Sequence, residues 1–270
     1  MSSPPNPQFE YDPLASPPPS LIPAEPRRDE DPPWTGWDVF LIAIFAVGSI
    51  FALLLATTFA AHKFLYPWAP TVDVAQYPLV TIAAQLLGYG AILLFMIFLV
   101  TRRGLPFWRS VRWNWPSNLL PYLLGGIALS LSLQAVAHWL PMPKELPMDR
   151  FFQTTRQAWV LAIFGTTLAP LMEELFFRGF LYPVLARRIG IGTSVFVTAL
   201  AFSLIHAPQL GRAWGPVLVI FLVGLTLTIT RVVSKSVAAG VVMHMAYNGT
   251  LSVLMFIATD RFHHLERLNQ

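Results

Sequence analysis

The chain has 270 residues, of which 55% are hydrophobic and 12% are charged, and it contains no cysteine. An ordinary soluble domain carries about 25% charged residues. The low charge and the mean hydropathy of +0.56 therefore exclude a typical soluble enzyme, a disordered chain and a fibrous protein. The lack of cysteine excludes a disulfide framework, thiolate metal sites and a cysteine nucleophile.

The first 33 residues differ from the rest in composition. They hold 11 of the 24 prolines, six acidic and two basic residues, and they show no apolar periodicity. Such a segment buries too little apolar surface to offset the entropy lost on ordering it. It also lacks the basic start and the apolar run of a signal peptide. We expect residues 1–33 to form a disordered, acidic, Pro-rich tail, which leaves room for partner docking or regulation.

Seven apolar runs follow the tail, and each is close to the about 20 residues that a membrane-spanning helix needs. They cover residues 37–61, 77–101, 118–140, 157–178, 193–209, 214–231 and 236–258. The predicted fold is therefore all-α, a polytopic transmembrane helix bundle of about seven spans in a lipid bilayer. We divide it into the tail, N-terminal transmembrane helices at 34–144, a second group of helices at 145–260 and a C-terminal tail at 261–270.

Basic residues follow the ends of the second, fourth and sixth runs: Arg102, Arg103, Arg109, Arg112, Arg187, Arg188, Arg231 and Lys235. The positive-inside rule places these ends in the cytoplasm. We therefore expect a multi-pass protein of the cell membrane whose N-terminal tail is cytoplasmic, while the basic C-terminal residues leave the side of the C-terminus open. The isoelectric point near 9.6 reflects these loops, and we expect no nucleic acid as a partner.

Four ionisable side chains stand out because charge inside a bilayer is costly and marks function by default. From the fourth run to the seventh, the only acids are Glu173 and Glu174, and the only histidines are His206 and His244. Glu174 and Arg178 are four residues apart on one helix face, so they can pair. Glu173 points about 100° away from Glu174. This predicts that Glu174 is a structural acid and that Glu173 is a chemical base. The alternative is a Glu–Arg pair that only fixes helix packing, which leaves Glu173 unpaired.

Residue counts from the turns indicate which groups share a depth in the membrane. Glu174 lies 16 residues before Gly190 and His206 lies 16 residues after it, so a helical hairpin brings them to the same height. His244 and Asn248 share a face of the seventh run, but straight helices leave His244 roughly 9 Å short of that height. The alternatives are a satisfied core histidine for His206 and an interhelical hydrogen bond for His244 and Asn248.

Two kinds of amide hydrolysis fit these residues. Glu173, His206 and His244 could hold a divalent metal such as zinc and leave one position for water. Alternatively, Glu173 alone acts as a general base on water, while an imidazole and the Asn248 amide stabilise the oxyanion. The sequence has no His-Glu-x-x-His and no Gly-x-Ser-x-Gly motif, which excludes a soluble zincin and a serine nucleophile elbow.

Taken in order, the motifs resemble the CAAX protease and bacteriocin-processing family (CPBP, also called Abi) of intramembrane endopeptidases. The family pattern is Glu-Glu-x-x-x-Arg, then Phe-x-x-x-His, then His-x-x-x-Asn or His-x-x-x-Asp, each in its own helix. The matching residues are Glu173, Glu174, Arg178, Phe202, His206, His244 and Asn248. The resemblance covers about residues 145–258, so the second group of helices is the expected catalytic core.

The resemblance implies an intramembrane peptidase in which Glu173 activates water with help from His206, and His244 and Asn248 contact the oxyanion or a metal. It implies a peptide or membrane-protein substrate. Eukaryotic members cut prenylated CAAX proteins, and bacterial relatives are linked to bacteriocin processing or self-immunity. Two alternatives stay open: a non-catalytic membrane scaffold or self-immunity protein, and a proton-coupled transporter that uses the same charged residues as a relay.

Overall fold

A computed structural model describes residues 32–143, 147, 152 and 154–265, and all regular structure within them is helical. The predicted tail at 1–33 lies outside the described residues except for its last two positions. The predicted boundary between the two groups of helices, at residues 144 and 145, also lies outside the described residues. The same holds for residues 266–270 of the predicted C-terminal tail.

In the described part of the chain, seven helical segments are long and apolar enough to cross a membrane. They are Gly36–Phe64 (α1), Pro78–Thr101 (α3), Leu120–Ala137 (α5), Thr155–Ile189 (α6, α7, η2 and α8), Ile191–Leu210 (α9 and η3), Trp214–Ser234 (α10) and Val237–Ala258 (α11). The short helices Thr71–Val74 (α2) and Phe107–Ser110 (α4) lie in connections. The predicted all-α transmembrane bundle is confirmed, and six of the seven predicted runs agree with these bounds to within a few residues.

The fourth predicted run is wrong at its C-terminal end. It was expected to stop at Arg178, but the helix continues to Ile189. The predicted run ends at a charged residue. Arg178 is instead completely buried inside the bundle, so its charge does not require the helix to leave the membrane there.

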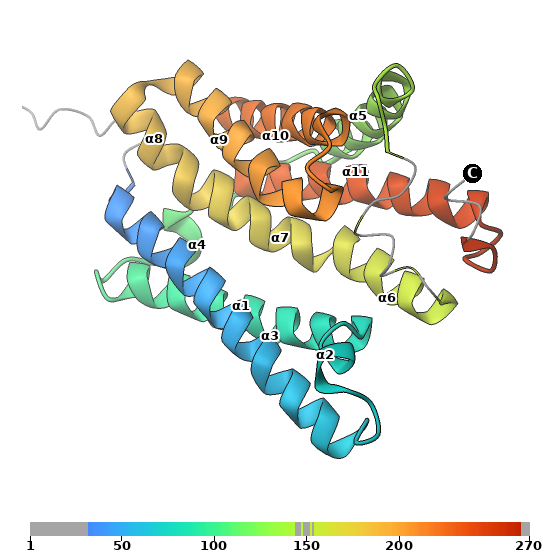
Figure 1. The fold of residues 1–270 in the computed structure, drawn as a ribbon. Helices are drawn as coiled ribbons and strands as arrows, with labels where there is room; N and C mark the ends of the chain where they lie inside the picture. Colours follow the sequence, from blue (N-terminus) through green and yellow to red (C-terminus); the bar gives the residue numbers. More distant parts are fainter. Residues whose placement is uncertain (1–31, 144–146, 148–151, 153, 266–270) are drawn as a thin grey trace, which may run out of the picture.

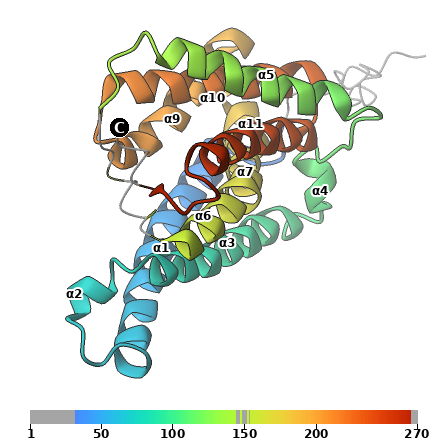
Figure 2. The same ribbon diagram turned by 90° about the vertical axis from the view of Figure 1, so that its right-hand side faces the viewer.

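The helices lie on two sides of the fourth span. α1 packs on α3, α9 packs on α10 and α5 packs on α11. Figures 1 and 2 show the α1–α3 pair on one side of α7, with α5, α9, α10 and α11 on the other. This arrangement surrounds the acidic stretch of the fourth span with other helices.

The fourth span is not one regular helix. It consists of α6 (Thr155–Thr166), α7 (Leu168–Glu174), the π-helical segment η2 (Leu175–Leu181) and α8 (Tyr182–Ile189). The break at Thr167 precedes Pro170, which lacks the backbone N–H that a continuous helix needs. π-Helical turns are rare, and they are frequent at functional sites. Glu173, Glu174 and Arg178 all lie within this irregular stretch.

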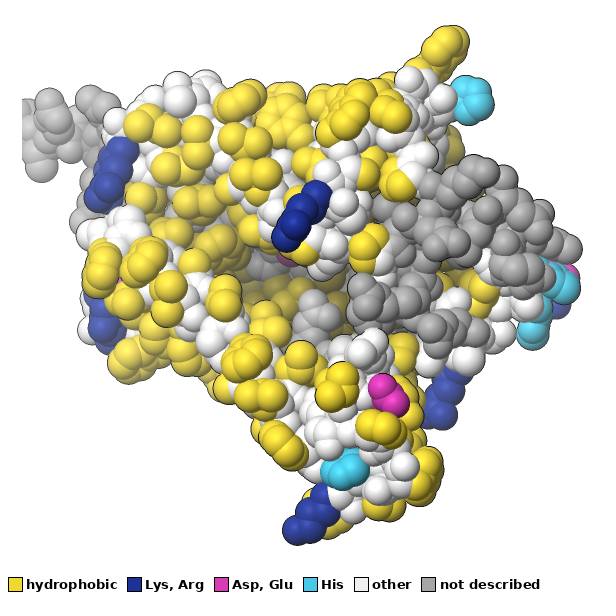
Figure 3. Space-filling model, in the orientation of Figure 1, with side chains coloured by type: hydrophobic (Ala, Val, Ile, Leu, Met, Phe, Trp, Pro, Cys, Tyr) yellow, Lys and Arg dark blue, Asp and Glu magenta, His cyan; other side chains and the backbone are white. Residues whose placement is uncertain are grey.

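The outer surface is apolar, as a bilayer requires. Val47 and Phe59 of α1, Leu94 of α3 and Ile257 of α11 are each more than half exposed. Figure 3 shows hydrophobic side chains spread over one whole face, with few charged groups among them. The same face is hollowed near its middle, over α7. So large an apolar surface marks an interaction surface, here with lipid.

The N-terminal end of α1 is tied to the fourth span and to α3. The Trp34 side chain is buried, stacks on Phe180 with the ring centroids 4.4 Å apart, and donates from Nε1 to the Phe180 carbonyl at 3.1 Å. The Asp38 carboxylate accepts two hydrogen bonds of 2.8 Å from Arg103 at the end of α3. These contacts fix the α1–α3 pair against the helix that carries the acidic residues.

Close contact between α5 and α11 depends on a glycine. A Cβ atom at Gly126 would clash with the Met243 carbonyl and lie 2.6 Å from the Ala246 methyl. Small residues let membrane helices approach each other in this way. The contact fixes the position of α11, which carries His244.

We expect Gly126→Ala to lower the melting temperature of the protein in detergent, because the added methyl group forces α5 away from α11. Gly48→Ala is the matched control, since a Cβ at Gly48 of α1 meets no atom within 4 Å. The control should be neutral or slightly stabilising, because alanine is favoured over glycine within helices. Equal melting temperatures for the two variants would contradict this account of the α5–α11 contact.

Candidate active site

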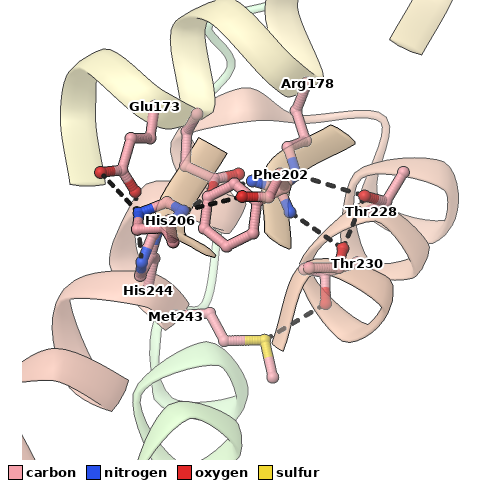
Figure 4. A network of polar contacts seen from close by, with 10 residues as sticks. Glu173, Arg178, Phe202, His206, Thr228, Thr230, Met243 and His244 are labelled. Atoms are coloured by element: carbon pink, nitrogen blue, oxygen red, sulfur yellow. Dashed lines mark hydrogen bonds and ion pairs between the residues drawn. The ribbon is translucent and has the colours of Figure 1, made fainter. Parts of the chain in front are cut away.

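Three helical segments bring five of the predicted site residues together. Glu173 and Glu174 end α7 and Arg178 follows in η2, while His206 ends α9 and His244 lies in α11. Figure 4 shows Glu173, His206 and His244 pointing toward one another, with Arg178 directed toward α10. Residues up to 71 positions apart in the sequence thus form one polar cluster inside an apolar bundle.

The Glu174–Arg178 pair predicted from the four-residue spacing is present. Arg178 Nη1 lies 2.7 Å from Glu174 Oε1, and neither side chain is exposed. Arg178 also donates from Nη2 to the Gly224 carbonyl at 2.9 Å and from Nε to Thr228 Oγ1 at 3.3 Å. The Phe202 ring lies 4.7 Å from the guanidinium carbon. Buried charge persists only when it is paired and hydrogen-bonded, and these contacts satisfy that requirement.

The paired carboxylate also fixes His244. Glu174 Oε1 lies 3.0 Å from His244 Nδ1. An ionised carboxylate can only accept a hydrogen bond, so the proton of this contact is on Nδ1. The other ring nitrogen, Nε2, faces Glu173 Oε2 at 3.8 Å. Glu174 therefore sets the orientation and the protonated position of the imidazole that faces its neighbour.

His206 is held in the same manner by the backbone. Its Nδ1 lies 2.7 Å from the Phe202 carbonyl oxygen one turn earlier in α9. Because a carbonyl can only accept, His206 Nδ1 carries the proton. His206 Nε2 then faces Glu173 Oε1 at 3.7 Å. Both imidazoles thus present Nε2 to the one carboxylate, each beyond direct hydrogen-bond distance.

The two glutamate side chains differ in how much of their surface is exposed. The Glu173 side chain is 18% exposed, whereas that of Glu174 is 0% exposed. His206 is 16% exposed, so a small molecule has access to the Glu173–His206 side of the cluster. The carboxylate without an arginine partner is therefore the one that can be reached from outside. The structural role expected for Glu174 agrees with this geometry, and the catalytic role of Glu173 stays a prediction.

The expected depth mismatch of His244 is wrong. His244 contacts Glu174 directly, although counting residues from the turns left it roughly 9 Å short. That count assumed that the fourth and seventh spans begin at one height. Figure 1 shows α8 and the start of α9 projecting beyond the start of α11, so the two turns lie at different levels.

Asn248 lies one turn after His244, as predicted, but its amide is already engaged. Asn248 Nδ2 donates to the Gly165 carbonyl at 2.7 Å, near the break between α6 and α7. One of the two amide N–H groups is therefore committed to holding α11 against α6. The contact of Asn248 with an oxyanion stays a prediction. It would use the second N–H of the amide.

Several residues of the site carry no charge, and the charge-based reasoning missed them. Gly224 and Thr228 of α10 hold Arg178. A Cβ atom at Gly240 of α11 would lie 2.7 Å from Glu174 Oε2, so only glycine leaves room for that carboxylate. A glycine or a threonine in the middle of an apolar span is the sequence signal that could have indicated these residues.

The predicted metal ligands face one another without forming a metal site. Glu173, His206 and His244 supply the donor types of a catalytic zinc centre. Among the described residues, however, no group of three or more His, Cys, Asp or Glu is placed to hold a metal ion. The two histidines face different oxygens of Glu173, at 3.7 and 3.8 Å. As placed, these side chains do not fit a shared ion, and the metal site stays a prediction.

Comparison with known families supports the predicted resemblance. The family model described as type II CAAX prenyl endopeptidase Rce1-like matches residues 155–250. This segment is therefore similar to the Rce1-like family. It runs from the start of α6 into α11 and contains all six predicted site residues. The resemblance to the CPBP family is therefore confirmed. No curated protein and no solved structure matches the chain.

The Rce1-like match and the seven apolar spans together indicate a multi-pass membrane protein with a CAAX-type intramembrane protease segment. α1 to α5 lie outside the matched residues, so the match assigns no function to the N-terminal helices.

Arg178→Ala should destabilise the protein by about 3–5 kcal/mol, because it leaves the Glu174 carboxylate buried and unpaired. The matched control is Arg102→Ala, which removes a half-exposed arginine 3.5 Å from Asp38. An exposed ion pair of this kind contributes about 0–1 kcal/mol. Thermal unfolding in detergent measures both variants, and a near-normal melting temperature for Arg178→Ala would count against the buried pair.

Proposed function

We propose that the chain is an intramembrane endopeptidase that hydrolyses a peptide bond with a water molecule activated by Glu173. One observation carries this proposal: a partly exposed carboxylate faces two imidazole Nε2 atoms at 3.7 and 3.8 Å. Each imidazole is fixed through its other nitrogen. Polar groups at this separation are commonly bridged by water, and a carboxylate with oriented imidazoles is suited to general base catalysis.

Hydrolysis then follows in two steps. Glu173 accepts a proton from the water, and the water oxygen forms a bond to the scissile carbonyl carbon while the carbonyl oxygen becomes negatively charged. Glu173 next returns the proton to the peptide nitrogen as the C–N bond breaks, which yields a carboxylic acid and an amine. His206 Nε2 lies beside Glu173 and orients the water. His244, held in place by Glu174, and the second amide N–H of Asn248 stabilise the oxyanion.

The substrate is proposed to be a peptide or a membrane protein with a CAAX-type C-terminus, prenylated as the description of the family implies. The apolar surface hollowed over α7 supports access for a lipid-modified chain from within the bilayer. We also propose that the N-terminal tail is cytoplasmic, because basic residues follow the second, fourth and sixth spans.

A resident divalent metal is the alternative source of an activated water. Glu173, His206 and His244 would be its ligands, and it would lower the pKa of the bound water. Both mechanisms use the same three side chains. The test below therefore includes a chelator, so that the two mechanisms give different results.

Glu173→Gln should lower peptide cleavage by about 10²- to 10⁴-fold while leaving the melting temperature near that of the wild type, because the amide cannot accept the proton of water. Asp73→Asn is the matched control, since it removes a carboxylate on α2 far from the site in sequence. We would measure cleavage of a farnesylated CAAX peptide and its unprenylated counterpart in proteoliposomes, with and without a zinc chelator.

Loss of cleavage in the variant alone supports direct activation by Glu173. Loss in chelator as well, restored by added zinc, supports the metal mechanism. Normal cleavage by Glu173→Gln overturns the role of Glu173. If the folded wild-type protein cleaves neither peptide, the protease proposal gives way to a scaffold or self-immunity protein, or to a transporter if a pH gradient drives flux in the same vesicles.

A further inference from the structure

Two arginines at the end of α8 lie against the segment that leads into α1. Arg187 donates from Nη1 to the Pro32 carbonyl and from Nη2 to the Trp34 carbonyl, each at 3.3 Å. A Cβ atom at Gly36 would lie 3.3 Å from Nη1 of Arg188, so this guanidinium packs on the first turn of α1. The fourth span therefore presents two positive charges to the start of the first span.

Two arginines at the end of α3 face the same turn of α1. Arg103 donates to both oxygens of Asp38 at 2.8 Å, and Arg102 lies 3.5 Å from that carboxylate. We call the four arginines around the start of α1 the basic collar: Arg102, Arg103, Arg187 and Arg188. Their four positive charges and the single negative charge of Asp38 leave the collar with a net charge of +3.

The chain that precedes the collar carries three consecutive acids, Asp29, Glu30 and Asp31. They lie outside the described residues and directly before Pro32, which is buried and held by Arg187. An extended chain spans at most about 3.6 Å per residue, so the Cα atoms of this acidic triplet lie within about 11 Å of the Cα atom of Pro32. Covalent geometry thus keeps three carboxylates beside the collar.

The charges of the two segments are complementary. The acidic triplet carries −3 and the basic collar +3. Exposed ion pairs contribute little one at a time, but several charges in a network stabilise one another. The preceding residues, Arg27 and Arg28, are basic, so the complementary stretch ends at Asp29.

We infer that the acidic triplet docks on the basic collar and fastens the start of α1 to α8 and to the end of α3. The collar is then an interaction surface whose occupant is a segment of the same chain. This contact would extend the anchor formed by the Trp34 stack on Phe180. It concerns the N-terminal helices and does not depend on the proposed protease function.

A distance measurement between two spin labels tests this inference. The chain contains no cysteine, so labels can be attached to introduced cysteines alone. We would label Pro26→Cys, three residues before the triplet, and Thr193→Cys, an exposed position in the first turn of α9. Pulsed EPR in nanodiscs of neutral lipid should give a narrow distance distribution at low salt. It should broaden in about 1 M salt, where the Debye length falls to about 3 Å.

Two further variants of the labelled protein identify the charges involved. Asp29→Asn/Glu30→Gln/Asp31→Asn should broaden the distribution already at low salt, because it removes the charge of the triplet. The matched control is Glu10→Gln/Asp12→Asn, which removes acids from a part of the tail farther from α1 and should keep the distribution narrow.

Arg188→Gln tests the collar itself, since it removes a charge without breaking the hydrogen bonds of Arg187 to the backbone. It should broaden the distribution at low salt. Its control is Arg156→Gln, which removes an exposed arginine at the start of α6 and should change nothing.

A broad distribution for the otherwise unchanged protein at low salt overturns the inference, as does a narrow one in the triplet variant. Anionic lipid headgroups are the competing occupant, because they attract basic segments at the membrane surface. Broadening when anionic lipid replaces neutral lipid in the nanodiscs would assign the collar to the headgroups and would also overturn the inference. None of these readouts uses peptide cleavage, so failure of the proposed function leaves the test unaffected.

Discussion

The buried ion pair between Glu174 and Arg178 is the interaction on which the rest of the site depends. Neither side chain is exposed, and the surroundings are apolar, so either charge alone would be very costly. The pair persists because α10 supplies the Gly224 carbonyl and the Thr228 hydroxyl to Arg178, and α11 supplies His244 to Glu174. One ion pair thus fixes three helices relative to one another.

The second consequence of the pair is chemical. Because Arg178 and His244 occupy Glu174 Oε1, the neighbouring Glu173 carboxylate has no arginine partner and is the more accessible of the two. His244 is at the same time turned so that Nε2 faces Glu173. Two adjacent residues of the same type therefore acquire different properties from the helix faces on which they lie. The π-helical turn that follows Glu174 belongs to the same irregular stretch, as is common at functional sites.

Much of this arrangement could be predicted from the sequence, for identifiable reasons. Runs of apolar residues have the length of a bilayer, so the spans were located to within a few residues except at the end of the fourth. The four-residue spacing of Glu174 and Arg178 placed them on one helix face, and equal counts from Gly190 brought His206 to the glutamates. Spacing and counting do not reveal which helices are neighbours. For that reason the contacts of Arg178 with α10 and of Asn248 with Gly165 were not foreseen.

The central claim is that the Glu174–Arg178 pair holds a proton on His244 Nδ1 and directs Nε2 toward Glu173. The ¹⁵N chemical shifts of the histidine rings in the folded protein test it most directly, with the His244 signals assigned by their loss in His244→Gln. The account predicts a protonated Nδ1 in the wild-type protein. A neutral His244 ring with its proton on Nε2 and a bare Nδ1 would contradict it.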